Sequence, residues 1–401
     1  MVNPFKYGVV VRGEDFADRE GEVADILRQL EALQSIILYS PRRYGKTSLM
    51  VEVLRKIREK GFLTALIDFY GVVSASEIAE KIVEEVVAKN YGRVEAFTAF
   101  LRNELGRLRP QVTANPDGSF GVSLRRDADA IGDEPVFEEV LDAPQKVSED
   151  KEKFFVVVYD EFQEITGLNG ERMLKIIRSK LQHHNRVAYV FMGSKIHVLA
   201  EIFAEPGKAF YRSAKPYQLG AIPKQPFSTY IRRKFEETNV EVEEDIIRQI
   251  LDFTNGHPYS TQQFSHEVWD LAAVRGRFEE KDLEDAVAHI LDTERDFYTH
   301  IWDGLSLYQR RALAALASEE TENPYSSDYV SRQRLTSASH VQKALNFLFR
   351  EGLVVKENGT YRVSDVFLRE WMRRMFVVDT TVRKTIRPRR TTSSQDEEAK
   401  S

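Results

Sequence analysis

The sequence of 401 residues contains no cysteine. This absence excludes disulfide bridges, thiolate metal sites and cysteine nucleophiles, and it is compatible with a reducing compartment. No apolar run approaches the roughly 18 residues that indicate a membrane-spanning helix. The first residues, Met1 to Lys6, lack the apolar segment of a secretory signal. We therefore expect a cytoplasmic protein.

An excess of positive charge is also missing. The chain has 57 Lys and Arg against 63 Asp and Glu, which gives a net charge of −6. A chain-wide basic surface for nucleic acid is thus excluded, and any such surface has to be local. Hydrophobic residues make up 42% and charged residues 30% of the chain. This composition is typical of globular proteins, and the length allows about two to four domains.

The first informative segment combines a short apolar strand at 36–39, a polar turn, a helix from Thr47 and a second strand at 63–69. This order is typical of a parallel α/β sheet. The turn ends in Gly45-Lys46-Thr47, which fits the end of the P-loop pattern G-x-x-x-x-G-K-[ST]. Ser40 stands at the place of the first glycine. The alternative is a positively charged turn without a ligand.

The P-loop pattern carries a specific chemistry. Its turn directs backbone N–H groups at one anion, and the following helix presents its positive end to the same point. We expect Lys46 to neutralise the β- and γ-phosphates, Thr47 to ligate Mg²⁺, and Gly45 to let phosphate approach the backbone. The residues expected to contact ATP are Ser40, Pro41, Arg42, Arg43, Tyr44, Gly45, Lys46, Thr47 and Ser48.

A second motif follows the most apolar strand of the chain, at 154–159, which ends in Asp160-Glu161. Such a strand suits the centre of a parallel sheet. Asp160 would hold the water shell of Mg²⁺ together with Thr47, and Glu161 would orient and deprotonate the attacking water. The alternative interpretation is an ordinary acidic turn.

Two further residues are candidates for the same chemistry. Ser194 follows the strand at 188–192, where a hydroxyl would hydrogen-bond the γ-phosphate or the attacking water. Arg212 lies in the next loop and would reach phosphate in cis, or reach a neighbouring subunit in trans. An ordinary turn and a solvated arginine are the alternatives.

Helical patterns fill about 75–107, and a helix at 171–184 with the strand at 188–192 completes the α/β alternation. Residues 108–150 are polar and contain an expected hairpin between Gln111 and Leu124, so we interpret them as an insertion at the edge of the sheet. The expected domains are 1–222 (ATPase core), 223–300 (helical lid), 301–378 (winged helix) and 379–401 (disordered tail).

Three motifs together resemble one family. The segments 41–49, 158–163 and 256–259 are similar in kind and order to the archaeal ATPase family, a branch of the STAND class of AAA+-related P-loop NTPases. The segment 16–20 resembles the N-terminal box of that family, and the resemblance covers about residues 8–290.

The resemblance implies an ATP-binding α/β core with a parallel sheet between helices, a helical lid and often a C-terminal winged helix. It implies that Arg19 lies near the base or phosphates. It also implies that Pro258 packs near the nucleotide from the lid, with His257 close by. The main departure is Ser40, which bears on the rate of hydrolysis more than on binding.

The C-terminal segment predicts a winged helix on independent grounds. Helices at 307–318, near 328 and at 338–351 precede a hairpin whose tip is Asn358-Gly359, the strongest short hairpin signal. Residues 331–374 carry nine Lys and Arg against four Asp and Glu, a local net charge of +5. The expected contacts with double-stranded DNA are His340, Lys343, Asn346 and Arg350 on the third helix, and Lys356 and Arg362 on the wing.

The leading hypothesis is an ATP- and Mg²⁺-dependent molecular switch that hydrolyses ATP slowly and binds DNA through its winged helix. A second hypothesis is a nucleotide-gated protein-interaction scaffold without DNA binding. A third is a replication-initiator-like ATPase, because archaeal origin-recognition proteins share the order of core, lid and winged helix. A homo-oligomer is compatible with all three.

Overall fold

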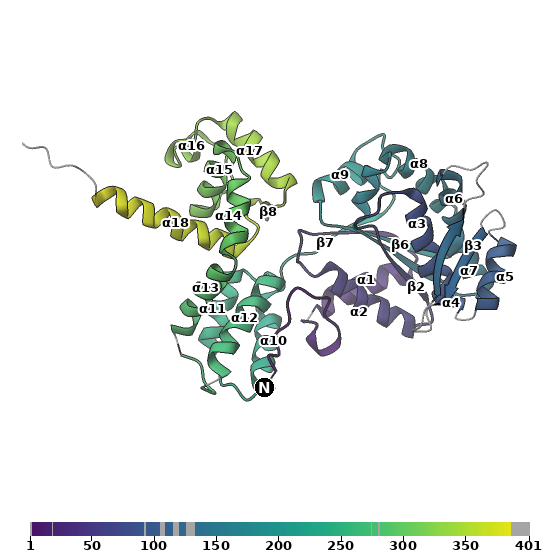
Figure 1. The fold of residues 1–401 in the computed structure, drawn as a ribbon, viewed down its shortest axis with the longest axis horizontal. Helices are drawn as coiled ribbons and strands as arrows, with labels where there is room; N and C mark the ends of the chain where they lie inside the picture. Colours follow the sequence, from purple (N-terminus) through teal and green to yellow (C-terminus); the bar gives the residue numbers. More distant parts are fainter. Residues whose placement is uncertain are drawn as a thin grey trace, which may run out of the picture. The chain divides into compact units, whose positions relative to one another are not determined.

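The computed structural model describes residues 2–17, 19–91, 94–104, 109–114, 120–125, 133–273, 275–279 and 281–385. The chain divides into two compact units, Met1–Ala286 and Val287–Ser401. Figure 1 shows an α/β fold followed by helices in the first unit, and a smaller, mainly helical second unit with a two-stranded sheet.

A five-stranded sheet forms the centre of the first unit, in the order β2-β5-β6-β1-β7. All its neighbouring strands pair in parallel, which confirms the expected sheet. The strands are β1 (Ile36–Tyr39), β2 (Leu63–Asp68), β5 (Phe155–Asp160), β6 (Val187–Gly193) and β7 (Lys215–Gln218). Every residue of β5 and β6 is buried, as expected for apolar strands covered on both faces.

Helices cover both faces of this sheet (Figure 1). On one face, α1 (Glu20–Glu31) and α2 (Lys46–Glu59) pack on alternate residues such as Val156 and Val158. On the other face, Val157 and Tyr159 join a larger core. That core includes residues of α3 (Ala75–Ile82), the π-helix η2 (Val83–Ala88), α5 (Val94–Glu104), η3 (Phe162–Gly167), α8 (Gly170–Leu181) and α9 (Ile196–Ala204).

The expected insertion at 108–150 has two parts. Strands β3 (Arg109–Ala114) and β4 (Phe120–Arg125) form the expected antiparallel pair, and residues 115–119 between them lie outside the described residues. The second part differs from the expectation. Helices α6 (Asp133–Val140) and α7 (Ala143–Asp150) bury Phe137, Val140 and Val147 in the core. Their apolar residues recur at helical spacing among many polar ones, so the helices belong to the layer on the sheet.

The expected lid comprises α10 (Lys224–Glu236), α11 (Glu244–Thr254) and α12 (Pro258–Ala273) in the first unit, and α13 (Lys281–Thr293), which spans the boundary between the two units. The N-terminal segment lies against α10 and α12. Phe5 packs on Phe235, with ring centroids 4.9 Å apart, and Asn3 donates a 3.0 Å hydrogen bond to the His266 carbonyl. The same segment reaches the ATPase core, where the Val11 amide donates to Ser48 Oγ at 3.2 Å.

The second unit has the expected order of elements. The elements are α14 (Arg295–Asp303), α15 (Leu307–Ser318), α16 (Ser327–Arg332), α17 (Ala338–Arg350), β8 (Val354–Glu357), β9 (Thr360–Val363) and α18 (Val366–Thr385). The expected three helices before its hairpin are α15, α16 and α17, and the Ser326 and Ser337 side chains cap α16 and α17 by accepting backbone N–H groups.

The last helix extends beyond its expected end. Helix α18 continues to Thr385, so residues 379–385 of the expected disordered tail are helical, while 386–401 lie outside the described residues. In the part of the chain that the structure describes, no helix is long and apolar enough to cross a membrane.

Candidate active site

The turn between β1 and α2 curls around Lys46. Two of its residues have left-handed backbone, Arg43 (φ +66°) and Gly45 (φ +83°), and Gly45 adopts this conformation without steric cost. The curled turn brings its carbonyl groups to the lysine. Lys46 Nζ donates to the Ser40 carbonyl at 3.1 Å and to the Pro41 carbonyl at 3.2 Å.

The charge of Lys46 is buried. Burial lowers the pKa of its ammonium group, while the nearby carboxylates of Glu161 and Asp160 raise it. Only 6% of the residue is exposed. A buried cation with few charged partners is destabilising, so an anion placed at this turn would be bound favourably.

Thr47 and Asp160 meet beside this lysine, as the two motifs predict. Thr47 Oγ1 donates to Asp160 Oδ2 at 2.9 Å. Burial raises the pKa of Asp160, the Thr47 hydrogen bond lowers it, and the negative charge of Glu161 raises it. A hydroxyl and a carboxylate side by side are hard oxygen ligands, which fit Mg²⁺ held with the phosphates of a nucleotide.

Glu161 is held by two side chains. Ser194 Oγ donates to Glu161 Oε2 at 2.9 Å, and Gln163 Nε2 donates to the same oxygen. Strand β6 lies between β1 and β5, and this order brings Ser194 to the end of β5. Ser194 thus contacts the expected base. Gln163 was missed as a site residue, although it closes the second motif; its polarity in a buried turn is the signal that could have found it.

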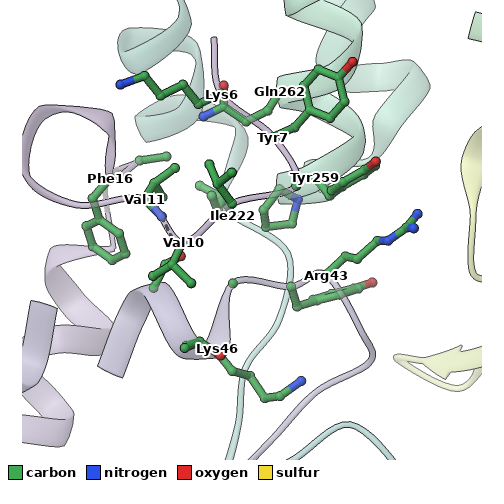
Figure 2. A pocket seen from close by; sticks show the side chains of 18 of the residues that line it. Lys6, Tyr7, Val10, Val11, Phe16, Arg43, Lys46, Ile222, Tyr259 and Gln262 are labelled. Atoms are coloured by element: carbon green, nitrogen blue, oxygen red, sulfur yellow. Dashed lines mark hydrogen bonds between the residues drawn. The ribbon is translucent and has the colours of Figure 1, made fainter. Parts of the chain in front are cut away.

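A cavity of about 500 Å³ opens between the P-loop, the N-terminal segment and the lid (Figure 2). Lys46 lies at one end, and apolar side chains of Val11, Phe16 and Ile222 lie further along the wall. Expected residues that line it are Arg19, Arg42, Arg43, Tyr44, Gly45, Lys46, Thr47, Ser48, Glu161 and Pro258. Lining residues missed by sequence reasoning are Lys6, Tyr7, Gly8, Val9, Val10, Val11, Phe16, Ala17, Tyr70, Ile222, Phe227, Tyr259 and Gln262.

Arg19 lines the cavity, yet its guanidinium donates hydrogen bonds to groups of the protein. Its Nη2 donates to the Tyr44 carbonyl at 3.2 Å and to the Gly220 carbonyl at 3.0 Å, and its Nη1 bonds Glu22 at 3.2 Å. Burial lowers the pKa of this guanidinium, while the charge of Glu22 raises it. Arg19 therefore ties the P-loop to the segment that leaves β7.

P-loop side chains contact the start of lid helix α12. The rings of Tyr44 and His257 meet edge to face with centroids 4.7 Å apart, and Arg43 Cζ lies 4.4 Å from the centroid of Tyr259. Pro258 is the first residue of α12, a position where proline is favourable. The expected placement of His257 and Pro258 near the P-loop is thus what the structure has.

Arg212 lies elsewhere. It is exposed, has a left-handed backbone (φ +53°), and its Cζ is 5.3 Å from the centroid of the Tyr211 ring. It lines a separate apolar pocket beside β1, α9 and β7, with residues such as Tyr39 and Phe203. The structure does not bring it to the P-loop cavity, so a contact in cis is absent here, and its role in trans stays a prediction.

On the winged helix, the expected polar face of α17 is exposed. Lys343, Asn346 and Arg350 face solvent, whereas Val341, Ala344, Leu345 and Leu348 are buried. Phe349 is half-buried. His340 is exposed and packs on Tyr308, with ring centroids 4.8 Å apart. Lys356 on the wing lies over the Tyr361 ring at 4.7 Å.

Part of the local positive charge is neutralised within the second unit. Arg362, an expected DNA contact, pairs with Glu357 across the hairpin. Arg332 pairs with Glu319 at 2.7 Å, and Arg369 pairs with Glu320. These two glutamates precede residue 331, so the net charge of +5 for residues 331–374 does not include them. Among the described residues of this segment, Lys343, Arg350 and Lys356 of the expected DNA contacts form no ion pair within the chain, and Arg334 is exposed as well.

Comparisons with known proteins agree with this architecture. A family model described as "ATPase domain predominantly from Archaea" matches residues 16–264, and a model described as "Probable winged helix domain" matches residues 296–374. None of the curated proteins compared with the chain matches it.

Two solved structures share the fold. A Walker-type ATPase of Pyrococcus abyssi is 19% identical, with 92% of this chain and 99% of that chain covered and a TM-score of 0.62. The ORC2 protein of Aeropyrum pernix, in ADPNP–ADP complexes, is 14% identical, with 94% and 98% covered and a TM-score of 0.55. At these identities the likeness concerns the fold alone. Because the ATPase model spans more than half of the sequence and its motifs meet in one site, the chain belongs to the family of ATPase domains found predominantly in Archaea, and a winged helix domain follows its ATPase domain.

Proposed function

We propose that the chain binds ATP with Mg²⁺ in the P-loop cavity, hydrolyses it slowly, and acts as a molecular switch whose winged helix binds double-stranded DNA. One observation carries the proposal. Lys46, Thr47 and Glu161 line one end of a cavity whose other walls are largely apolar, and Asp160 stands behind Thr47 as its hydrogen-bond acceptor. This arrangement suits a ligand with a charged phosphate tail and a flat apolar base.

Each polar group at this end has a role in phosphoryl transfer. Lys46 supplies positive charge where burial makes it effective, together with the N-terminus of α2. Thr47 and Asp160 would hold Mg²⁺, which supplies neutralisation of phosphate charge when bound. Glu161 orients a water molecule and accepts its proton on attack at the γ-phosphate.

Slow turnover is supported by two features. Ser40 replaces the first glycine of the P-loop pattern, and its side chain is buried and donates to the Pro41 carbonyl at 3.2 Å. Glu161 is the one carboxylate of the P-loop cavity lining among the described residues. Hydrolysis therefore depends on a single base.

The proposed nucleotide-dependent switch is supported by the segments that form the walls of the cavity. The walls come from the P-loop, the N-terminal segment and the lid, which are distant in sequence. A nucleotide bound between them contacts all three, and the γ-phosphate adds contacts that ADP lacks. ATP and ADP would then favour different lid populations through their differential affinity.

The first test is ATP turnover by the full chain with Mg²⁺, for the wild type, Lys46→Ala and Glu161→Gln. Lys46→Ala should lose nucleotide binding. Glu161→Gln should keep binding and lose turnover by a factor of about 10²–10⁴, the usual contribution of a general base. The matched controls are Lys175→Ala and Glu171→Gln, an exposed pair on α8 (3.3 Å) that should behave as wild type. Full turnover in both site variants would contradict the proposal.

DNA binding is supported by the exposed face of α17 and by Lys356. Duplex affinity should fall steeply with salt, because each phosphate contact releases counterions. Lys343→Ala and Arg350→Ala should each weaken binding and reduce the slope against the logarithm of salt by about 1. The control is Arg332→Ala, whose guanidinium already pairs with Glu319. Absence of binding at low salt with either nucleotide would rule out DNA as the partner.

The protein-interaction scaffold is the second candidate, and two observations favour it. The ion pairs of Arg332, Arg362 and Arg369 reduce the positive field of the winged helix. Leu307 and Tyr308, at the start of α15, are 60% and 46% exposed. ATP-dependent association that ignores DNA would select this candidate. Binding of one duplex sequence in strong preference to others would favour the replication-initiator-like candidate.

A further inference from the structure

We infer that Gln163 is a positioning residue that fixes which carboxylate oxygen of Glu161 takes the proton from water. This inference rests on the proposed ATP hydrolysis. Glu161 lines the P-loop cavity and Gln163 does not, so we infer that Gln163 acts on the reaction through Glu161.

Two donors meet the same oxygen of Glu161. Gln163 Nε2 donates to Oε2 from the η3 turn, and Ser194 Oγ donates to Oε2 at 2.9 Å from the end of β6. The second N–H of the Gln163 amide lies toward Glu164 Oε1, 3.4 Å from Nε2. Glu161 Oε1 is the oxygen left for a water molecule in the cavity. A carboxylate held at one oxygen by two elements has little freedom to rotate.

The orientation of the Gln163 amide is set by its surroundings. Only its N–H groups can face Glu161 and Glu164, because carboxylates accept hydrogen bonds. Its carbonyl oxygen is buried and has no hydrogen-bond partner in the structure. That oxygen lies against Gly193, where an added Cβ would overlap it. A larger residue at 193 would therefore displace the amide.

The placement of the Gln163 amide lowers the stability of the fold but helps to orient Glu161 as a base. Gln163 is only 2% exposed, and an unpaired buried acceptor is destabilising, whereas an apolar side chain of similar size would avoid that cost. Glu161 itself has a left-handed backbone (φ +47°), a conformation that non-glycine residues adopt mainly where the structure enforces it. Its amide donates to Asp160 Oδ1 at 2.9 Å. Backbone and side chain of the base are thus both constrained.

We expect that removal of the Gln163 amide slows only the chemical step of ATP hydrolysis. Without the Gln163 amide, Glu161 loses one of its two donors and samples orientations that do not face the water. The expected result for Gln163→Met is a kcat lowered by about tenfold, a fraction of the usual contribution of a general base, with KM and the affinity for ATP unchanged.

The experiment is a double-mutant cycle in the full chain, with ATP turnover and ATP affinity measured for wild type, Gln163→Met, Glu161→Gln and the double variant. Because Gln163 acts through the carboxylate, Gln163→Met should have no further effect once Glu161 is Gln. Gly193→Ala should reproduce the loss in kcat by displacing the amide, and this keeps the test open if Gln163→Met folds poorly. Gln182→Met, an exposed site, is the matched control.

The outcomes separate the two proposals. An unchanged or raised kcat in Gln163→Met and Gly193→Ala, or an equal loss with and without Glu161, overturns the role of Gln163 and leaves ATP hydrolysis standing. A wild-type chain that binds ATP without hydrolysing it, or a Glu161→Gln variant as fast as wild type, overturns hydrolysis by Glu161 and the positioning role with it.

Discussion

Lys46 and Asp160 are buried groups of opposite charge, and for each of them burial disfavours the charged form. The pKa of Lys46 is lowered and that of Asp160 is raised, in both cases first by burial. Thr47 and the Glu161 amide each donate one hydrogen bond to Asp160, which compensates only in part. The nucleotide-free site is therefore electrostatically costly, and binding of phosphate and Mg²⁺ would relieve that cost.

At the residue scale, Asp160→Asn should stabilise the nucleotide-free chain while it abolishes turnover. The folded pKa of Asp160 lies above its usual 3.8, so between the two values the folded chain binds more protons than the unfolded chain. Stability then falls as the pH rises through this interval. The gain in the free energy of unfolding from Asn should be present at pH 8 and should shrink as the pH falls toward the usual carboxyl pKa. Urea unfolding of both chains at pH 8 and near that pKa measures it, and a loss at pH 8 would contradict the argument.

At the scale of elements, the lid depends on the connection between α11 and α12. Helix α11 ends at Thr254, and the next two residues, Asn255 and Gly256, are both in left-handed conformation (φ +51° and +67°). Gly256 accepts a 3.0 Å hydrogen bond from the Ile222 amide, and an added Cβ would overlap the Ile222 carbonyl. This close approach directs the start of α12, with Pro258 and Tyr259, to the P-loop cavity.

Gly256→Ala should therefore lower the melting temperature more than the replacement of a glycine that has a left-handed backbone but no close neighbour. The control is Gly207→Ala, since Gly207 also has a positive φ (+88°) but has open space around its Cα. In both variants the left-handed backbone of the new alanine lowers the free energy of unfolding by about 1 kcal/mol or more. In Gly256→Ala the new Cβ also clashes with a carbonyl group. Thermal unfolding measures the difference, and equal shifts would show that the approach to Ile222 is not limiting.

At the scale of the whole molecule, the proposed switch requires coupling between nucleotide and DNA. If ATP changes the affinity for DNA by some factor, DNA must change the affinity for ATP by the same factor. Titrations with a non-hydrolysed ATP analogue and with ADP should give DNA affinities that differ by roughly 5-fold or more. Lys46→Ala should abolish this dependence. Equal DNA affinity with both nucleotides, at several salt concentrations, would leave the scaffold as the better account.

The strands and motifs of the core were predictable because their signals are local. The apolar runs at β1, β5 and β6 and the Asn358-Gly359 turn match the structure within a residue or two. Strand β7 was missed, since it is a short, mostly exposed edge strand that contains Pro216, with few apolar residues to indicate it. Helices α6 and α7 were assigned to an insertion because their buried residues are separated by polar ones.

The fold class, the P-loop and the Asp160-Glu161 pair can be predicted from the amino-acid sequence, because each of these depends on neighbours in the chain. Which distant residues share a site becomes visible in the folded chain. The tertiary structure places residues 6–11 and 258–262 around one cavity, gives Glu161 its partners Gln163 and Ser194, and pairs Arg332 and Arg369 with Glu319 and Glu320. The physical reason is that burial, pairing and charge neutralisation depend on distance in space, which a linear pattern does not contain.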